Sequence, residues 1–203
     1  MKLHWSPRSP FVRKVMIVAH ELGLTGRLDC VRTVAATTRP HPELMHDNPL
    51  SKIPTLVLDD GTVLYDSRVI CEYLDGLDGR HTMFPADGVA RFVALRRQAL
   101  GDGALDFLLL LRNEHERPQP SPMHLAAYTT KKQSVLKSLE QEADGLAATP
   151  FNIGHVAIGT ALSYLDFRYA DEDWRTPHPR IANWHRDFCA RSSVRATEPI
   201  DDS

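Results

Sequence analysis

The chain has 203 residues, enough for one large domain or two small ones that each bury a core. Its formal net charge is −2, so no overall positive field attracts nucleic acid or an anionic membrane. No apolar run approaches the roughly 18 residues of a membrane span, and the first residues lack the apolar stretch of a signal peptide. We therefore expect a cytoplasmic protein with no nucleic-acid or membrane partner.

The cysteines and histidines indicate no metal centre. Cys30, Cys71 and Cys189 are widely spaced and form no C-x-x-C motif, and the ten histidines are scattered. An odd number of distant cysteines predicts neither a disulfide framework nor a zinc site. We expect reduced, mostly buried thiols and no bound metal.

The first part of the chain alternates between strand and helix patterns. Residues 1–5 are a short strand candidate, and Ser9 followed by Pro10 is a helix start, since serine caps a helix and proline fits its first position. Apolar residues then recur at three- and four-residue steps, at Val12, Val15, Met16, Ala19 and Leu22. Residues 27–34 predict a second strand, and residues 35–48 predict a loop with one helical turn.

A hairpin and a helix complete this part. Residues 55–65 are two apolar runs around Asp60-Gly61, which supplies the positive φ angles of a tight turn. Asp66-Ser67 caps a further helix. The order βαβ then ββα predicts an α+β domain over residues 1–78, followed by a linker over residues 79–88.

Beyond this linker only helical periodicity is found. Helices are predicted over residues 89–115, 123–147, 153–170 and 179–191. Gly101 and Gly103 interrupt the pattern of the first, and three prolines between 118 and 122 separate it from the second. The third is apolar on all sides, as expected at the centre of a bundle. The sequence therefore predicts an all-helical bundle domain over residues 89–203.

Four elements in order resemble the glutathione transferase superfamily over essentially the whole chain, and look most like bacterial cytosolic members with a serine at the first helix start. They are residues 6–15 (SPxSPFxRKV), 48–56 (NPLSKIPTL), 64–74 (LYDSxxIxxYL) and the apolar helix over 152–168. The resemblance implies a thioredoxin-like domain that binds glutathione as co-substrate, an all-helical second domain, a homodimer and no metal.

Ser9 is the candidate catalytic residue. A helix N-terminus carries free N–H groups and a partial positive charge, which lower the pKa of a thiol placed there. A hydroxyl that donates a hydrogen bond to the sulfur favours the thiolate further. The resemblance implies that Ser9 does this for glutathione; the alternatives are that Ser9 is only a helix cap, or that Ser6 contacts the sulfur. No cysteine lies nearby, which disfavours mixed-disulfide chemistry.

The remaining glutathione contacts are implied by the same resemblance. In the family the proline at position 54 follows a cis bond, so that Ile53 offers its backbone groups to the cysteinyl part of glutathione like an added strand. Lys52 would lie near the glycine carboxylate, or be a solvated loop lysine. Asp66 and Ser67 would hold the γ-glutamyl end, or cap the helix only. The predicted glutathione-binding set is Phe11, Lys52, Ile53, Pro54, Asp66 and Ser67.

A second-substrate pocket is expected between the two halves. Its candidate lining residues are Trp5, Arg8, Phe107, Leu108, Leu111 and Arg112. An arginine there would attract an acidic or electrophilic carbonyl substrate. Many family members carry aspartate near the start of the apolar helix, where this chain has His155; we interpret His155 as structural.

The predicted function is glutathione transfer, in which the activated thiolate attacks a small electrophile. Two alternatives stay open. One is a glutathione-dependent isomerase or peroxidase. The other is a non-catalytic interaction protein on the same fold, of the kind that binds RNA polymerase during starvation.

Overall fold

The computed structural model describes residues 1–36, 38–77 and 79–202, so the predicted domain boundary at residue 78 lies outside the described residues. The chain divides into two compact units. The first comprises Met1–Asp87 and Ser192–Ser203, and the second comprises Gly88–Arg191. An α+β unit followed by a helical one is the predicted fold class, which the structure confirms.

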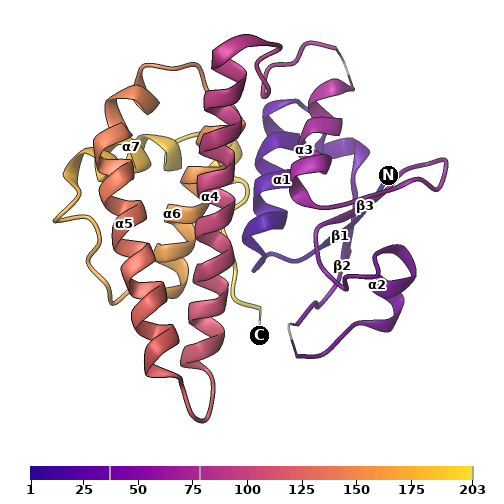
Figure 1. Ribbon diagram of the computed structural model, residues 1–203. Coiled ribbons are helices and arrows are strands. Elements are labelled where there is room, and N and C mark those ends of the chain that lie inside the picture. The colour runs from indigo at the N-terminus through magenta and orange to yellow at the C-terminus, as the bar shows by residue number, and fades with distance from the viewer. Residues whose placement is uncertain (37, 78, 203) are drawn as a thin grey trace. The chain divides into compact units, whose positions relative to one another are not determined.

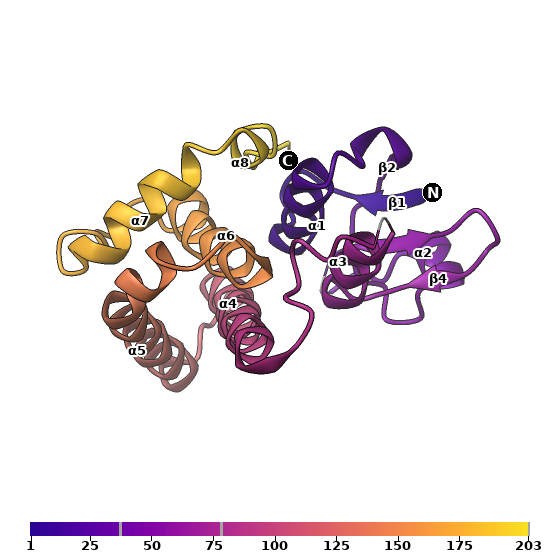
Figure 2. The same ribbon diagram turned by 90° about the horizontal axis from the view of Figure 1, so that it is seen from above.

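The first unit is built on a four-stranded mixed sheet. Its strands are β1 (Lys2–Trp5), β2 (Asp29–Arg32), β3 (Thr55–Val57) and β4 (Val63–Leu64), in the order β2-β1-β3-β4. β1 is parallel to β2 and antiparallel to β3, and β3 is antiparallel to β4. Helices α1 (Pro10–Glu21) and α3 (Ser67–Gly76) lie on one side of the sheet, and α2 (Pro42–Asp47) lies on the other (Figures 1 and 2). A short 3-10 helix, Thr25–Arg27, leads into β2.

The apolar periodicity of the sequence explains this packing. The α1 positions Val12, Val15 and Ala19 are at most 1% exposed, as are Leu3 of β1 and Leu56 of β3. Side chains three and four residues apart share one face of a helix, so these three predicted positions form a buried face of α1. Met16, also predicted for this face, is partly exposed. The core of the first unit therefore lies between α1, α3 and the sheet.

The end of the chain belongs to this first unit. The sequence analysis assigned residues 192–203 to the helical domain, whereas the structure groups them with the sheet. The reason is a set of contacts between α8 (Ser192–Arg195) and α1, which Figure 2 shows side by side. The Ser193 hydroxyl donates to Glu21 Oε1 at 2.5 Å, and Arg13 Nη2 donates to the Val194 carbonyl at 3.4 Å.

The second unit is a helical bundle. It contains α4 (Gly88–His115), α5 (Pro122–Ala147), α6 (Ile153–Arg168) and α7 (Pro179–Cys189). Every residue of α6 from Ile153 to Leu165 is buried. This helix is therefore the centre of the bundle, as its uniform hydrophobicity predicted.

Gly101 does not interrupt α4, which is continuous through both glycines. A side chain at Gly101 would place its Cβ 2.5 Å from the Ala157 backbone, whereas nothing lies within 4 Å of a Cβ at Gly103. The missing side chain lets α4 cross α6 at close range. The glycine is thus a packing requirement of the helix pair.

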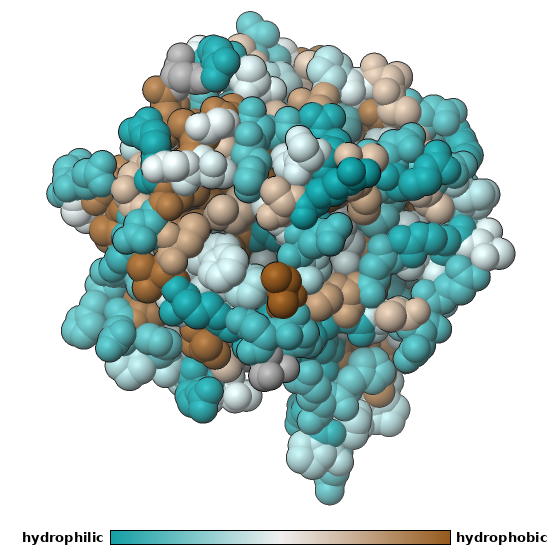
Figure 3. Space-filling model, turned by 180° about the vertical axis from the view of Figure 1, so that it is seen from behind, coloured by the Kyte–Doolittle hydropathy of each residue, from teal (hydrophilic) through white to brown (hydrophobic). Residues whose placement is uncertain are grey.

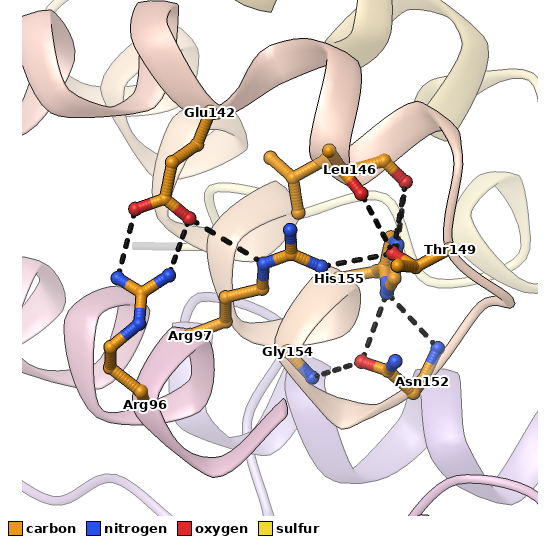
Figure 4. Close-up of polar contacts among 9 residues, drawn as sticks. Arg96, Arg97, Glu142, Leu146, Thr149, Asn152, Gly154 and His155 are labelled. Atoms are coloured by element: carbon orange, nitrogen blue, oxygen red, sulfur yellow. Dashed lines mark hydrogen bonds and ion pairs between the residues drawn. The ribbon is translucent and has the colours of Figure 1, made fainter. Parts of the chain in front are cut away.

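The start of α6 is closed by a capping box (Figure 4). The Gly154 amide donates to Asn152 Oδ1 at 2.9 Å, and the Asn152 amide donates to His155 Nδ1 at 3.2 Å. The opposite ring nitrogen, Nε2, carries the proton and donates it in a hydrogen bond to the Leu146 carbonyl at 3.0 Å. Both ring nitrogens are used by the neutral imidazole, and burial lowers the pKa of His155. His155 therefore has the structural role predicted for it.

Among the described residues, no helix is long and apolar enough to cross a membrane, and no three or more His, Cys, Asp or Glu side chains are grouped so that they could hold a metal ion. The face drawn in Figure 3 mixes hydrophilic residues with small apolar areas. Isolated apolar residues on a surface are ordinary in globular proteins.

Candidate functional site

Strand register brings three predicted site segments to one edge of the sheet. His4, near the end of β1, pairs with Thr55, the first residue of β3. Leu64, the last residue of β4, pairs with Leu56. Ser9 follows the end of β1, Ile53-Pro54 precedes β3, and Asp66-Ser67 follows β4, so all three segments meet at this edge. We call it the site edge.

Ser9 is the N-cap of α1. Its Oγ accepts a hydrogen bond from the Val12 amide at 3.3 Å, and its backbone carbonyl accepts from the Arg13 amide at 2.9 Å. A hydroxyl that accepts a hydrogen bond can still donate its own proton. Pro10 has no N–H, and no hydrogen bond from the Phe11 amide is found in the described part of the chain. Over the described residues the Ser9 hydroxyl donates no hydrogen bond, so it combines an available donor with the positive end of a helix.

The segment before β3 is held by side chains that satisfy its own backbone. Asn48 is 1% exposed and its Nδ2 donates to the Lys52 carbonyl at 3.1 Å and to Thr55 Oγ1 at 2.9 Å. The Thr55 hydroxyl donates to the same carbonyl at 2.8 Å. The Ile53-Pro54 bond is cis, as the resemblance implied. Within the described ranges no hydrogen bond uses the backbone N–H or C=O of Ile53, so both are available to a ligand.

A polar cluster anchors α2, which leads into this segment. Asp47 Oδ2 accepts from Lys2 Nζ at 2.6 Å and lies 2.8 Å from His4 Nε2. These hydrogen bonds to Lys2 and His4 lower the pKa of the Asp47 carboxyl. His4 also lies 2.9 Å from Thr33 through Nδ1. The end of α2 is thereby fixed to β1 next to the site edge.

The start of α3 is only partly capped. Asp66 is exposed, and its Oδ1 accepts from the Arg68 amide at 2.9 Å. Ser67 is 2% exposed, yet no hydrogen bond to its hydroxyl is found over the described residues. A buried hydroxyl normally has a partner, and a helix N-terminus favours an anion. The hydroxyl and the first amides of α3 therefore form a ready site for a carboxylate.

The other predicted residues fall into two groups. Lys52, Trp5 and Arg8 belong to the first unit, where Lys52 is exposed and Trp5 and Arg8 are partly exposed. In α4, Leu108 and Leu111 are buried in the bundle core at 2% and 1%, whereas Phe107 and Arg112 keep exposed surface. Arg112 Nε donates to Glu116 Oε1 at 2.7 Å. A role in binding the second substrate stays a prediction for all of these residues.

The structure adds two charged residues, Arg32 and Asp202, that the sequence analysis did not single out. Arg32 ends β2 opposite Trp5, at the site edge, and its guanidinium binds Asp202. Arg8 binds the same carboxylate. The acidic end of the chain is visible in the sequence, but its pairing depends on the path of the final residues along α1. No local pattern encodes that path.

Known proteins match this arrangement along the chain. A family model for the N-terminal domain of glutathione S-transferases matches residues 8–77, and one for the C-terminal domain matches residues 122–187. An uncharacterized GST-like protein of Escherichia coli, YibF, is 32% identical over 203 residues, covering 98% of both chains. The α+β unit and the helical bundle are those of this class. The chain belongs to the glutathione S-transferase family.

Solved structures agree with this conclusion. A glutathione transferase family member from Pseudomonas fluorescens, solved with bound glutathione, is 40% identical with a TM-score of 0.94 and covers 98% of both chains. A structure from the same organism, with bound S-(propanoic acid)-glutathione, is 38% identical, with a TM-score of 0.89 over 98% of this chain and 100% of that one.

Proposed function

We propose that this protein is a glutathione transferase that ionises the thiol of glutathione and directs the thiolate at a small electrophile. The observation that carries the proposal is the geometry of Ser9, whose hydroxyl accepts from Val12 and keeps its own proton free to donate at the start of α1. Two solved structures from Pseudomonas fluorescens, 40% and 38% identical to this chain, hold glutathione and S-(propanoic acid)-glutathione, which supports the choice of ligand.

The residues at the site edge would have separate roles in binding glutathione and in ionising its thiol. Ser67 and the first amides of α3 would bind the γ-glutamyl carboxylate, and the backbone of Ile53 would pair with the cysteinyl residue. The Ser9 hydroxyl would donate to the sulfur, which favours the charged form of the thiol. The thiolate then attacks an electrophilic carbon, an S–C bond forms, and the leaving group departs with its electron pair.

The test is glutathione conjugation to chlorodinitrobenzene by the wild type, Ser9→Ala and Ser6→Ala. Ser6 is the matched control, because it is a nearby serine whose Oγ accepts from the Arg8 amide at 3.4 Å. We expect kcat/KM to fall about a hundredfold in Ser9→Ala, as when one preorganised hydrogen-bond donor is removed. Equal losses in both variants would refute the assigned role of Ser9.

A non-catalytic role is the second candidate, because a stringent starvation protein A homolog of Coxiella burnetii is 36% identical over 91 residues. That match covers 45% of this chain. Immobilised protein would distinguish the two roles in a cell extract: a stoichiometric RNA polymerase partner, together with no measurable glutathione affinity, would favour the second candidate. A glutathione-dependent isomerase or peroxidase would instead bind glutathione and leave chlorodinitrobenzene unreacted.

We also propose that the protein is a homodimer. Val89 and Phe92, in the first turns of α4, are 79% and 71% exposed. Large apolar side chains at such exposure suit an interface between copies. Light scattering should give twice the chain mass for the wild type and a lower mass for Phe92→Asp; a monomeric wild type would contradict the proposal.

A further inference from the structure

Two arginines lie at the site edge, next to the candidate catalytic serine. Arg8 directly precedes Ser9, and Arg32 ends β2, where it pairs with Trp5 at the end of β1. Neighbouring guanidinium groups form a site for a planar anion, since each presents several N–H donors in a fixed fork. The question is which anion they hold.

In this structure the anion is a carboxylate of the chain itself. Asp202 Oδ1 lies 3.0 Å from Arg8 Nε, and Asp202 Oδ2 lies 2.8 Å from Arg32 Nε and 2.6 Å from Arg32 Nη2. Asp201 Oδ1 is 3.8 Å from Arg8 Nη1. One carboxylate thus joins both arginines, which shows that their spacing accommodates this group.

The final residues reach this place along α1. They start beside Glu21, near the end of the helix, pass Arg13 and finish at Arg8, just before its first turn. The last part is held loosely: the side chains of Asp201 and Asp202 are 45% and 31% exposed. Because these ion pairs are partly exposed to water, another carboxylate can reach the two arginines and compete with Asp202 for them.

Charge also argues for displacement. The start of α1 is where we propose that a thiolate binds, and two carboxylates near it would oppose that negative charge. Arg8 and Arg32 would favour the thiolate if these carboxylates moved away. A ligand that brings a single carboxylate would replace two negative charges by one beside the two arginines.

We propose that Arg8 and Arg32 form a binding site for the carboxylate of the second substrate, which Asp202 and Asp201 occupy until the substrate displaces them. The inference rests on the proposed function and narrows its substrate class to small electrophiles that carry a carboxylate. In the reaction the thiolate attacks the carbon that bears the leaving group, and the carboxylate is held unchanged.

The test compares two reaction products that differ in one group. S-carboxymethylglutathione carries a carboxylate where S-carbamoylmethylglutathione carries a neutral amide, and calorimetry gives the Kd of each without any need for turnover. The variants are Asp202→Asn and Arg8→Gln. Asp171→Asn is the matched control, because Asp171 is an exposed aspartate of the helical unit.

We expect the wild type to prefer the carboxylate conjugate. Asp202→Asn should lower the Kd of that conjugate roughly two- to fivefold, the range of a partly exposed ion pair, and leave the amide conjugate unchanged. Arg8→Gln should abolish the preference, and Asp171→Asn should have no effect on it.

Two outcomes separate this inference from the proposed function. If both conjugates bind equally to the wild type and to Asp202→Asn, or if Asp202→Asn leaves an existing preference unchanged, the inference is overturned and the proposed function stands. If neither glutathione nor either conjugate binds to the wild type, the proposed function fails as well.

Discussion

The helix N-termini of the two units differ in which hydrogen-bonding groups remain available to a ligand. At α6, in the helical unit, Asn152 and His155 satisfy each other and the backbone around them. At α1 and α3, in the first unit, the Ser9 hydroxyl keeps a free donor and the Ser67 hydroxyl has no hydrogen bond within the described residues. A polar N-cap residue is found at all three helices. It stabilises the fold in the helical unit and forms part of a binding site in the first unit.

The helical unit should be the more sensitive to changes in packing, with the largest effect at Gly101. Gly101→Ala should lower the free energy of unfolding by about 3 kcal/mol, because the new Cβ would lie 2.5 Å from the Ala157 backbone. Gly103→Ala is the matched control and should raise stability by about 0.5–1 kcal/mol, since alanine favours a helix and space is open there. Urea unfolding measures both; equal effects would contradict the close crossing of α4 and α6.

Removal of the N-cap of α6 should have the second largest effect on stability. Asn152→Ala removes the acceptor of the Gly154 amide and should cost about 2 kcal/mol, the upper range for an N-cap. Thermal unfolding checks this value, with glutathione affinity as the second readout. We expect that affinity to stay unchanged, and a variant that unfolds normally but loses glutathione would break the distinction between the two units.

The converse result is expected at α3. Ser67→Ala removes a hydroxyl that has no hydrogen bond over the described residues, so the free energy of unfolding should change by less than about 0.5 kcal/mol. Glutathione affinity should fall roughly tenfold, which corresponds to about 1.4 kcal/mol for one hydrogen bond to a charged group. Titration calorimetry measures the affinity, and Ser67→Thr, which keeps the hydroxyl, should retain most of it.

The smallest expected effect is a pH dependence that belongs to the helical unit. Burial lowers the pKa of His155 in the folded state, so the unfolded chain takes up the proton first as the pH falls below about 6.5. Stability should therefore be complete above that pH and decline below it, by at most about 1.4 kcal/mol per pH unit. His155→Gln should flatten this part of the profile, because glutamine can take the same capping position without titrating.

Much of the fold follows from local signals in the sequence. The caps at Ser9, Asp66 and Asn152, the apolar periodicity of α1 and the uniform hydrophobicity of α6 predicted these helices, because all of these signals act within short stretches of sequence. The sequence analysis misjudged Gly101 as an interruption of a helix. The position requires glycine because the backbone of α6, more than fifty residues away in the sequence, leaves no room for a side chain. The place of Asp202 could not be predicted either, as it depends on contacts between the two ends of the chain.

The most direct test of the account is the pKa of the glutathione thiol when bound, followed by thiolate absorbance in the ultraviolet. We predict a pKa well below the value of about 8.5 of a free thiol in the wild type and in Ser9→Thr, and a higher value in Ser9→Ala. Glutathione that binds with an unchanged pKa in all three proteins would contradict the account, and Ser9 would then be a helix cap only.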